Sequence, residues 1–153
     1  MTRDELLETA KVLPPFTTAS AHEYSAQREA IVTEINQLLL QRPDIHLMVG
    51  ASNIDMMRDN HANHARFVES LLLHYSAETL VETVLWVFRA YRSHGFHLTY
   101  WPAQLNAWVE VLRHRLSPES FAVIYPLYHW FIIHIPTFAA LTDSRIGQPA
   151  PEA

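Results

Sequence analysis

Two histidines stand three residues apart in the stretch DNHANH (residues 59–64). Neutral imidazole is a good ligand for zinc and iron, and it is also a hydrogen-bond partner inside protein cores. The two histidines belong to a series of otherwise apolar residues that are separated alternately by three and four positions. The series is Ile54, Met57, His61, His64, Val68, Leu71 and Tyr75. Because this spacing marks one face of a helix, we expect both rings to face inward. They would then be metal ligands, one wall of a pocket, or hydrogen-bonded core residues.

A metal site needs more ligands than this pair supplies. The chain contains neither Glu-x-x-His, which a carboxylate-bridged di-iron bundle uses, nor His-Glu-x-x-His. A simpler site would combine His61 and His64 with a third ligand such as His94. Cysteine is absent, which excludes disulfides, thiolate metal sites, cysteine nucleophiles and a thioether-linked chromophore.

A second group of chemically capable side chains lies in residues 89–102, where one predicted helix ends and the next begins. The simplest interpretation is a helix terminus, because basic residues in a last turn interact favourably with the helix dipole. The segment also combines guanidinium groups that suit carboxylates with imidazoles and aromatic walls. This combination favours a flat, acidic, aromatic ligand. The residues concerned are Arg89, Tyr91, Arg92, His94, His97 and Trp101.

The remaining candidates have simpler explanations. Glu110 and His114 lie four residues apart, as in an exposed helical pair. His129 and His134 fall on a strongly apolar helix, where a histidine more often satisfies a backbone or hydroxyl group than binds a ligand. We find no Ser-His-Asp arrangement and no glycine-rich phosphate loop.

Charge and hydropathy indicate which classes of partner and which cellular locations the chain is suited to. The net charge is −5, and Lys11 is the only lysine beside ten arginines, so a basic surface for nucleic acid is missing. The longest apolar run, residues 127–141, is interrupted by histidine and proline. We therefore expect no signal peptide, no membrane span and a cytoplasmic location.

The elements that position these residues are predicted to be helices only. Three glycines and no convincing alternating run indicate an all-α fold of about six helices around one core. We expect a short N-terminal helix and linker (1–19), a helical domain (20–141) and an unstructured tail (142–153). The predicted helices cover residues 2–13, 20–41, 53–74, 76–95, 99–116 and 117–141, the last bent at Pro126 and Pro136.

This pattern resembles the globin superfamily, and it is most similar to its divergent branches. His64 and His94 lie 30 residues apart, similar to the distal and proximal histidines of haem globins. The block from Trp86 to Trp101 is more similar to the non-haem sensor globins and to the bilin-biosynthesis-associated globins than to oxygen carriers. The resemblance implies a globin-like bundle with a pocket for haem, for a noncovalently held bilin, or for no cofactor.

The resemblance also implies roles for single residues. His94 would be the proximal metal ligand, with His97 as the alternative, and His64 would be the distal group, helped by His61. Three arginines would pair with the propionates, and four aromatic residues would form the walls. These are Arg89, Arg92 and Arg66, and Phe67, Phe88, Tyr91 and Trp101.

Three functional hypotheses follow. The first is a noncatalytic protein that binds a tetrapyrrole for sensing, carriage or storage. The second is a cofactor-free regulatory or assembly module that acts through protein–protein contacts and forms a homodimer through its aromatic surface. The third, an enzyme acting on a tetrapyrrole, has less support, because no acid–base pair can be identified from the residues.

Overall fold

A computed structural model describes residues 1–145, and every regular element in that range is helical. The all-α prediction is confirmed. The eight α-helices are α1 (Arg3–Lys11), α2 (Thr18–Leu40), α3 (Ile45–Val49), α4 (Ile54–Leu73), α5 (Ala77–Ser93), α6 (Tyr100–Arg115), α7 (Pro118–Ile133) and α8 (Ile135–Thr142), and a 3-10 helix, η1 (Asp143–Arg145), follows.

Several helix boundaries lie where local sequence predicts them. Thr2 and Glu5, three residues apart, form a capping box, because each side chain accepts a hydrogen bond from the other residue's backbone N–H. Ser76 caps α5 and Ser117 caps α7 through their side-chain oxygens. Gly95 follows the end of α5 with a φ of 101°, in the left-handed region that favours glycine.

The helix α2 starts at Thr18, two residues before the predicted boundary at residue 20. Thr17 caps it by accepting a hydrogen bond from the Ser20 backbone N–H. The carboxylate of Glu23, in the first turns of this helix, does not bond to the helix start. It binds Ser117 and Ser120 at the start of α7 instead.

The helix count also differs, for two local reasons. The connector around residues 43–50 contains the short helix α3, and the predicted last helix is divided into α7 and α8 at His134. The two parts meet at an angle of 47°. The proline at Pro136 fits the second helical position of α8, where its missing N–H costs nothing, whereas Pro126 stays inside α7. The predicted tail begins with the end of α8 and with η1, and residues 146–153 lie outside the described part.

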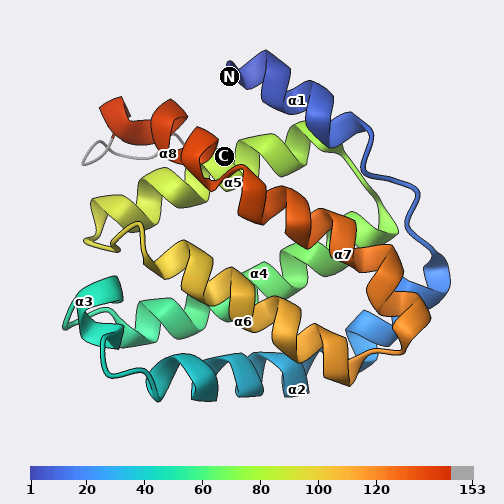
Figure 1. Cartoon of the computed structure of the whole chain (residues 1–153), viewed down its shortest axis with the longest axis horizontal. Helices are drawn as coiled ribbons and strands as arrows, with labels where there is room; N and C mark the ends of the chain where they lie inside the picture. The colour runs from blue at the N-terminus through green and yellow to red at the C-terminus, as the bar shows by residue number, and fades with distance from the viewer. Residues whose placement is uncertain (146–153) are drawn as a thin grey trace.

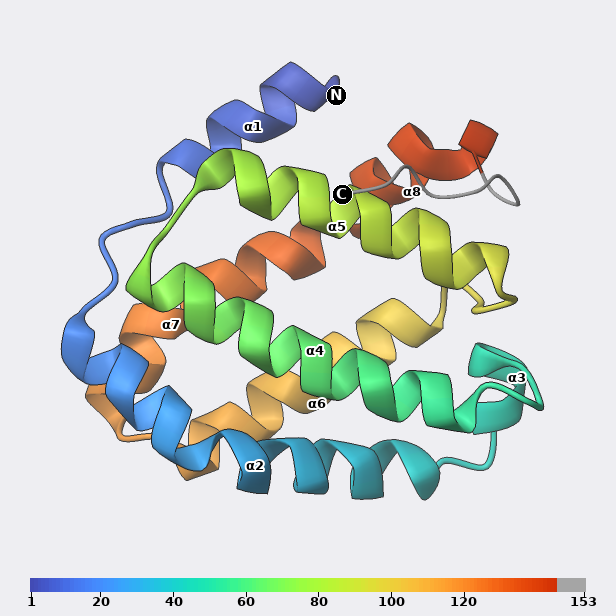
Figure 2. The same cartoon turned by 180° about the vertical axis from the view of Figure 1, so that it is seen from behind.

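The helices pack around one core. The helix α2 lies against α4, α6 and α7, while α1 and α8 lie against α5 (Figure 1). Figure 2 shows α5 and α4 running one above the other, with α6 and α7 behind them. The largest fully buried side chains come from α2, α6, α7 and α8: Trp108, Tyr24, Tyr100, Tyr128 and Phe138. This packing places the face of α4 that carries His64 opposite α5.

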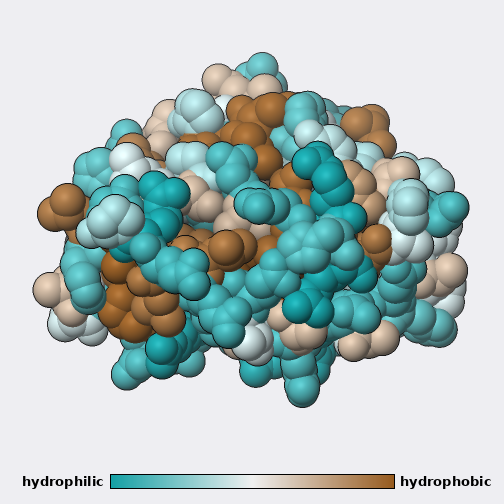
Figure 3. Space-filling view, turned by 60° about the horizontal axis from the view of Figure 1, so that its bottom comes forward, coloured by the Kyte–Doolittle hydropathy of each residue, from teal (hydrophilic) through white to brown (hydrophobic). Residues whose placement is uncertain are grey.

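In the described residues, no single helix has both the length and the apolar composition of a membrane span; α7 and α8 pass that test only together, as a bent pair. Figure 3 shows the molecule tilted so that the lower side of Figure 1 faces the viewer. Hydrophilic residues cover most of this face, and the hydrophobic residues on it form separate patches.

Candidate functional site

The helix α4 supplies one wall of the candidate site. Asn60, Asn63, His64 and Phe67 follow each other at steps of three, one and three, so they share one face of the helix. The start of α4 is tied to the end of α5 by Asn53. Its amide donates hydrogen bonds to the carbonyl oxygens of Val49 (2.8 Å) and His94 (2.7 Å). The backbone, and not the imidazole, of His94 therefore joins the two helices.

The opposite wall is aromatic and comes from α5 and α6. Phe88 stacks on Trp101 with ring centroids 4.4 Å apart, and Tyr91 meets Trp101 edge-on at 6.2 Å. Phe138 of α8 packs edge-on against Phe88 at 5.2 Å. Offset and edge-to-face pairs of this kind hold rings in fixed positions. The predicted wall residues Phe88, Tyr91 and Trp101 are thus brought together by tertiary contacts.

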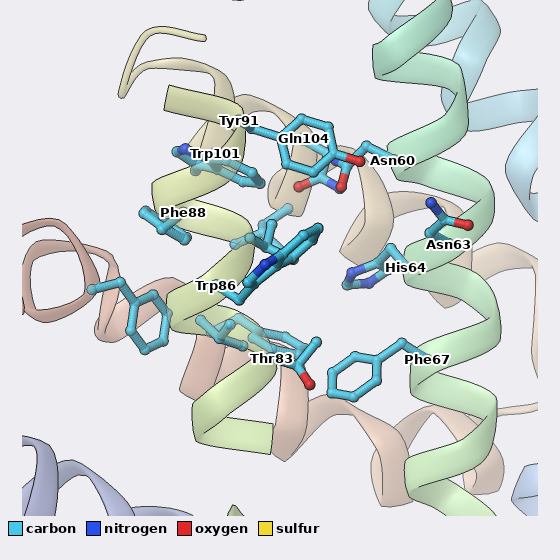
Figure 4. Close-up of a pocket in the computed structure, with 15 residues that line it drawn as sticks. Asn60, Asn63, His64, Phe67, Thr83, Trp86, Phe88, Tyr91, Trp101 and Gln104 are labelled. Atoms are coloured by element: carbon cyan, nitrogen blue, oxygen red, sulfur yellow. The ribbon is translucent and has the colours of Figure 1, made fainter. Parts of the chain in front are cut away.

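Between these walls lies a cavity of about 300 Å³. Figure 4 shows Tyr91, Gln104 and Asn60 at one end of it and Phe67 with Thr83 at the other, while Trp86 extends from α5 in the direction of His64. Trp86 is 44% exposed although it lines the cavity, so it is in contact with both the cavity and the solvent. The lining residues are Asn60, Asn63, His64, Phe67, Thr83, Val84, Trp86, Val87, Phe88, Tyr91, Trp101, Gln104, Leu105, Phe131 and Phe138.

His61 lies beneath the pocket, in a buried hydrogen-bond network. Its Nδ1–H donates to the side-chain oxygen of Asn36 at 2.6 Å, and its Nε2 accepts from the Tyr100 hydroxyl at 2.9 Å. The side-chain amide of Asn60 donates to the same hydroxyl at 2.8 Å. Burial lowers the pKa of His61 to about 3, so its ring is neutral near pH 7. Its role is structural support for Asn60.

His64 does line the pocket. Its Nε2 lies 2.9 Å from the Tyr128 hydroxyl, which in turn lies 3.1 Å from the Tyr24 hydroxyl. The ring also packs against Trp108 with centroids 4.6 Å apart. Burial, with a smaller effect of His61, lowers the pKa of His64 to about 3. The pocket therefore receives a neutral imidazole.

The predicted proximal histidines lie outside the pocket. His94 and His97 are both exposed in the turn between α5 and α6, and neither lines the cavity. The Nδ1 of His97 lies 3.0 Å from the Thr99 hydroxyl. The residues of α5 that face the cavity all precede His94. This arrangement places His94 at a helix terminus, which was the simpler of the two interpretations from sequence.

The predicted arginines also lie away from the cavity. Arg92 forms an ion pair with Asp143 at 2.7 Å, and Arg66 donates to the side-chain oxygen of Asn63 at 3.3 Å on the surface. Arg89 is only 6% exposed, and its Nε and one Nη atom have no hydrogen-bond partner in the described part of the chain. None of the three arginines lines the cavity.

These positions test whether the site suits haem or a bilin. Within residues 1–145, His64 is the one imidazole that lines the cavity, and its Nε2 is already engaged by Tyr128. None of the lining residues in this range carries a charge that would pair with a propionate. The described residues also hold no group of three or more histidines, cysteines or carboxylates placed for a metal ion. In this conformation the donors do not fit a tetrapyrrole.

Two other histidine candidates have structural partners. His114 pairs with Glu34 of α2 at 2.7 Å rather than with Glu110, and the same carboxylate binds Arg115 at 2.9 Å. The Nδ1 of His134 donates to the Trp130 carbonyl oxygen at 2.8 Å where α7 ends. Both are accounted for by helix packing.

Sequence reasoning missed the amides of the site. Asn60 and Asn63 precede the two histidines on α4, and Gln104 lies three residues after Trp101 on the inner face of α6. The signal was present, because Trp101, Gln104, Leu105 and Trp108 share one helical stripe. A polar residue inside an apolar stripe indicates either a buried partner or a ligand.

No protein-family model matches this chain, and no curated protein or solved structure is significantly similar to it.

Proposed function

We propose that this protein is a noncatalytic binding protein for a small, flat, largely apolar molecule, which it holds between α4 and α5. The supporting observation is the cavity of about 300 Å³, lined mainly by aromatic and aliphatic side chains with a few amides at one end. Small-molecule sites typically have this composition and a volume of roughly 300–1,000 Å³. A ligand of two or three fused rings matches this space better than a tetrapyrrole.

The lining argues against catalysis as the primary role. No carboxylate, lysine or arginine is among the lining residues of the described chain, and His64 is neutral and engaged. General acid–base chemistry needs a group poised to exchange a proton near the working pH. Binding alone needs only shape and a few polar contacts.

The globin-like arrangement remains part of this proposal. Two consecutive long helices, α4 and α5, bracket the cavity, and α4 directs His64 into it. This arrangement is compatible with the predicted globin-like bundle. Under the proposal, the same two helices hold a smaller ligand without an axial histidine.

The test is an NMR titration of the full chain with naphthalene. Trp86 and Trp101 line the cavity, whereas the Trp130 indole donates to Thr9 outside it at 2.8 Å. We expect the indole N–H signals of Trp86 and Trp101 to shift with a saturable, one-to-one dependence. The Trp130 signal should move less.

A cavity-filling substitution provides the matched control. We expect Val87→Phe, on the lining face of α5, to abolish the shifts and to stabilise the fold by about 0.5–2 kcal/mol. Val123→Phe, at a half-buried valine of α7 outside the cavity, should leave naphthalene binding intact. Unchanged binding in Val87→Phe, or no binding by the parent chain, would contradict the proposal.

The cofactor-free regulatory or assembly module stays the second candidate. The observation that favours it is the exposure of Trp86, because a large aromatic side chain on a surface is typical of protein interfaces. This candidate predicts a homodimer that Trp86→Ala converts to monomers in sedimentation velocity. A chain that is monomeric at every concentration, and that binds naphthalene, would contradict it.

A further inference from the structure

The polar end of the cavity shows which chemical groups a ligand needs, and this step rests on the function proposed above. Asn60 is fixed by the network beneath it. The Asn36 side-chain oxygen can only accept, so the proton of the neutral His61 ring is on Nδ1 and Nε2 is an acceptor. The Tyr100 hydroxyl therefore donates to His61 Nε2. The Tyr100 oxygen in turn accepts a hydrogen bond from the Asn60 amide N–H.

Fixing the amide nitrogen also fixes the amide oxygen. With its N–H₂ group turned toward Tyr100, Asn60 has its side-chain oxygen left as a hydrogen-bond acceptor, and the residue is only 4% exposed. Rotating the amide would set its oxygen against the Tyr100 oxygen, whose proton is already used by His61. The cavity therefore has an acceptor of fixed orientation at this end.

Gln104 provides the second polar group. It is 1% exposed and lines the cavity, yet no residue in the range 1–145 hydrogen-bonds its side-chain amide. Buried amides are nearly always paired, since an unpaired one costs free energy. Figure 4 shows Gln104 beside Asn60 at the same end of the cavity. Because its amide is free to rotate, Gln104 can either donate or accept.

The cavity offers no compensation for a charge. None of its lining residues in the described chain is charged, and moving a carboxylate into such a site removes its hydration without replacing it. A neutral polar group suffers a smaller loss, and the two amides recover it.

We propose that this pocket selects an uncharged planar molecule that carries a hydrogen-bond donor, held by the Asn60 side-chain oxygen, beside an acceptor or second donor held by Gln104. Phenols, lactams and primary amides on a fused-ring body belong to this class. The ring system lies between Phe88, Trp101 and His64, and its polar edge faces α4 and α6.

Four matched bicyclic probes test the proposal by the same indole titration. They are naphthalene, 2-naphthol, 2-methoxynaphthalene and 2-naphthoate, which offer no polar group, a donor, an acceptor without a donor, and an anion. We expect 2-naphthol to bind about tenfold more tightly than naphthalene and 2-methoxynaphthalene, and 2-naphthoate to bind more weakly than any of them.

A variant of Gln104 tests the contribution of this amide to the preference. Gln104→Met keeps the volume and removes the hydrogen-bonding group, so we expect the advantage of 2-naphthol over naphthalene to fall at least threefold while naphthalene still binds. Gln27→Met, at a half-buried glutamine of α2 outside the cavity, is the matched control and should keep the full advantage.

The outcomes separate the two proposals. Equal binding of all four probes, tightest binding of 2-naphthoate, or an unchanged preference in Gln104→Met would overturn the ligand class and leave the binding function standing. Failure of all four probes to shift Trp86 and Trp101 would overturn the binding function and, with it, the ligand class.

Discussion

At the scale of single residues, Arg89 is a charged side chain buried in the fold. It is a buried cation, and two of its nitrogen atoms lack acceptors within the described residues. A buried charge without a partner is strongly unfavourable, and replacing it by an apolar side chain of similar volume is often stabilising.

We therefore expect Arg89→Met to raise the free energy of unfolding by about 1–3 kcal/mol in urea denaturation. Arg66→Met, at an exposed arginine of α4, should change it little. A loss of stability in Arg89→Met would contradict this expectation, because it would mean that the guanidinium group has interactions that offset its burial.

His61 and His64 predict a pH dependence of stability. The pKa of each is about 3 in the folded chain, below the ordinary value near 6.5. The unfolded chain therefore binds more protons below pH 6.5, so this stability is present above that pH and is lost as the pH falls toward 3. Each histidine contributes a slope of about 1.4 kcal/mol per pH unit.

Between about pH 5 and about pH 6, where most carboxylates stay ionised, His64→Phe should reduce the measured slope by about half. The phenyl ring suits the aromatic surroundings of His64, and Tyr128 keeps its contact with Tyr24. His22→Phe, at an exposed histidine of α2, is the control. Equal slopes in all three chains would contradict the assignment.

At the scale of elements, Glu23 joins α2 to the start of α7. Its carboxylate accepts hydrogen bonds from the Ser117 backbone N–H, the Ser117 hydroxyl (2.9 Å) and the Ser120 hydroxyl (2.6 Å). These hydrogen bonds lower the pKa of Glu23, and the bond from the Ser120 hydroxyl has the largest effect. The carboxylate also lies where the helix dipole of α7 favours negative charge.

We expect Glu23→Ala to cost about 1.5–3 kcal/mol near neutral pH. The folded-state pKa is lowered, so this stability is present above the unfolded-state pKa and is lost as the pH falls through the folded-state value. The difference between parent and variant should therefore shrink in acid. Glu29→Ala, at an exposed glutamate of α2, should show no such loss. A pH-independent difference would contradict the carboxylate's role.

At the scale of the whole molecule, the cavity is formed by side chains from five helices. The lining comes from α4, α5, α6, α7 and α8, while α1 and α2 support it from outside. A larger ligand would have to separate α4 from α5 and expose the rings between them. The size of the ligand is thus limited by the packing of the entire bundle.

Titration with haemin and with biliverdin tests the tetrapyrrole prediction at this scale. We expect no saturable Soret or bilin band shift, because the described residues place neither a second imidazole nor a charged side chain in the cavity lining. A one-to-one shift that His94→Ala abolishes and His74→Ala, an exposed control, preserves would support the tetrapyrrole hypothesis. It would also require α5 and its following turn to rearrange.

The sequence by itself determined the helices and the inward face of α4. Caps such as Ser76 and Ser117, the glycine at Gly95 and the three-and-four spacing through His64 act within a few residues, so they can be read locally. The same local rules explain why His94, which directly follows the last residue of α5, has a structural interpretation as a helix terminus.

Only the tertiary structure decided which side chains meet. Tyr100 hydrogen-bonds His61, which is 39 residues away in the sequence, and Glu23 hydrogen-bonds Ser117, which is 94 residues away. Gln104 lines the cavity together with residues of four other helices. Periodicity states which face of a helix is buried, but the partner depends on how the helices cross, which is set by the packing of the core as a whole.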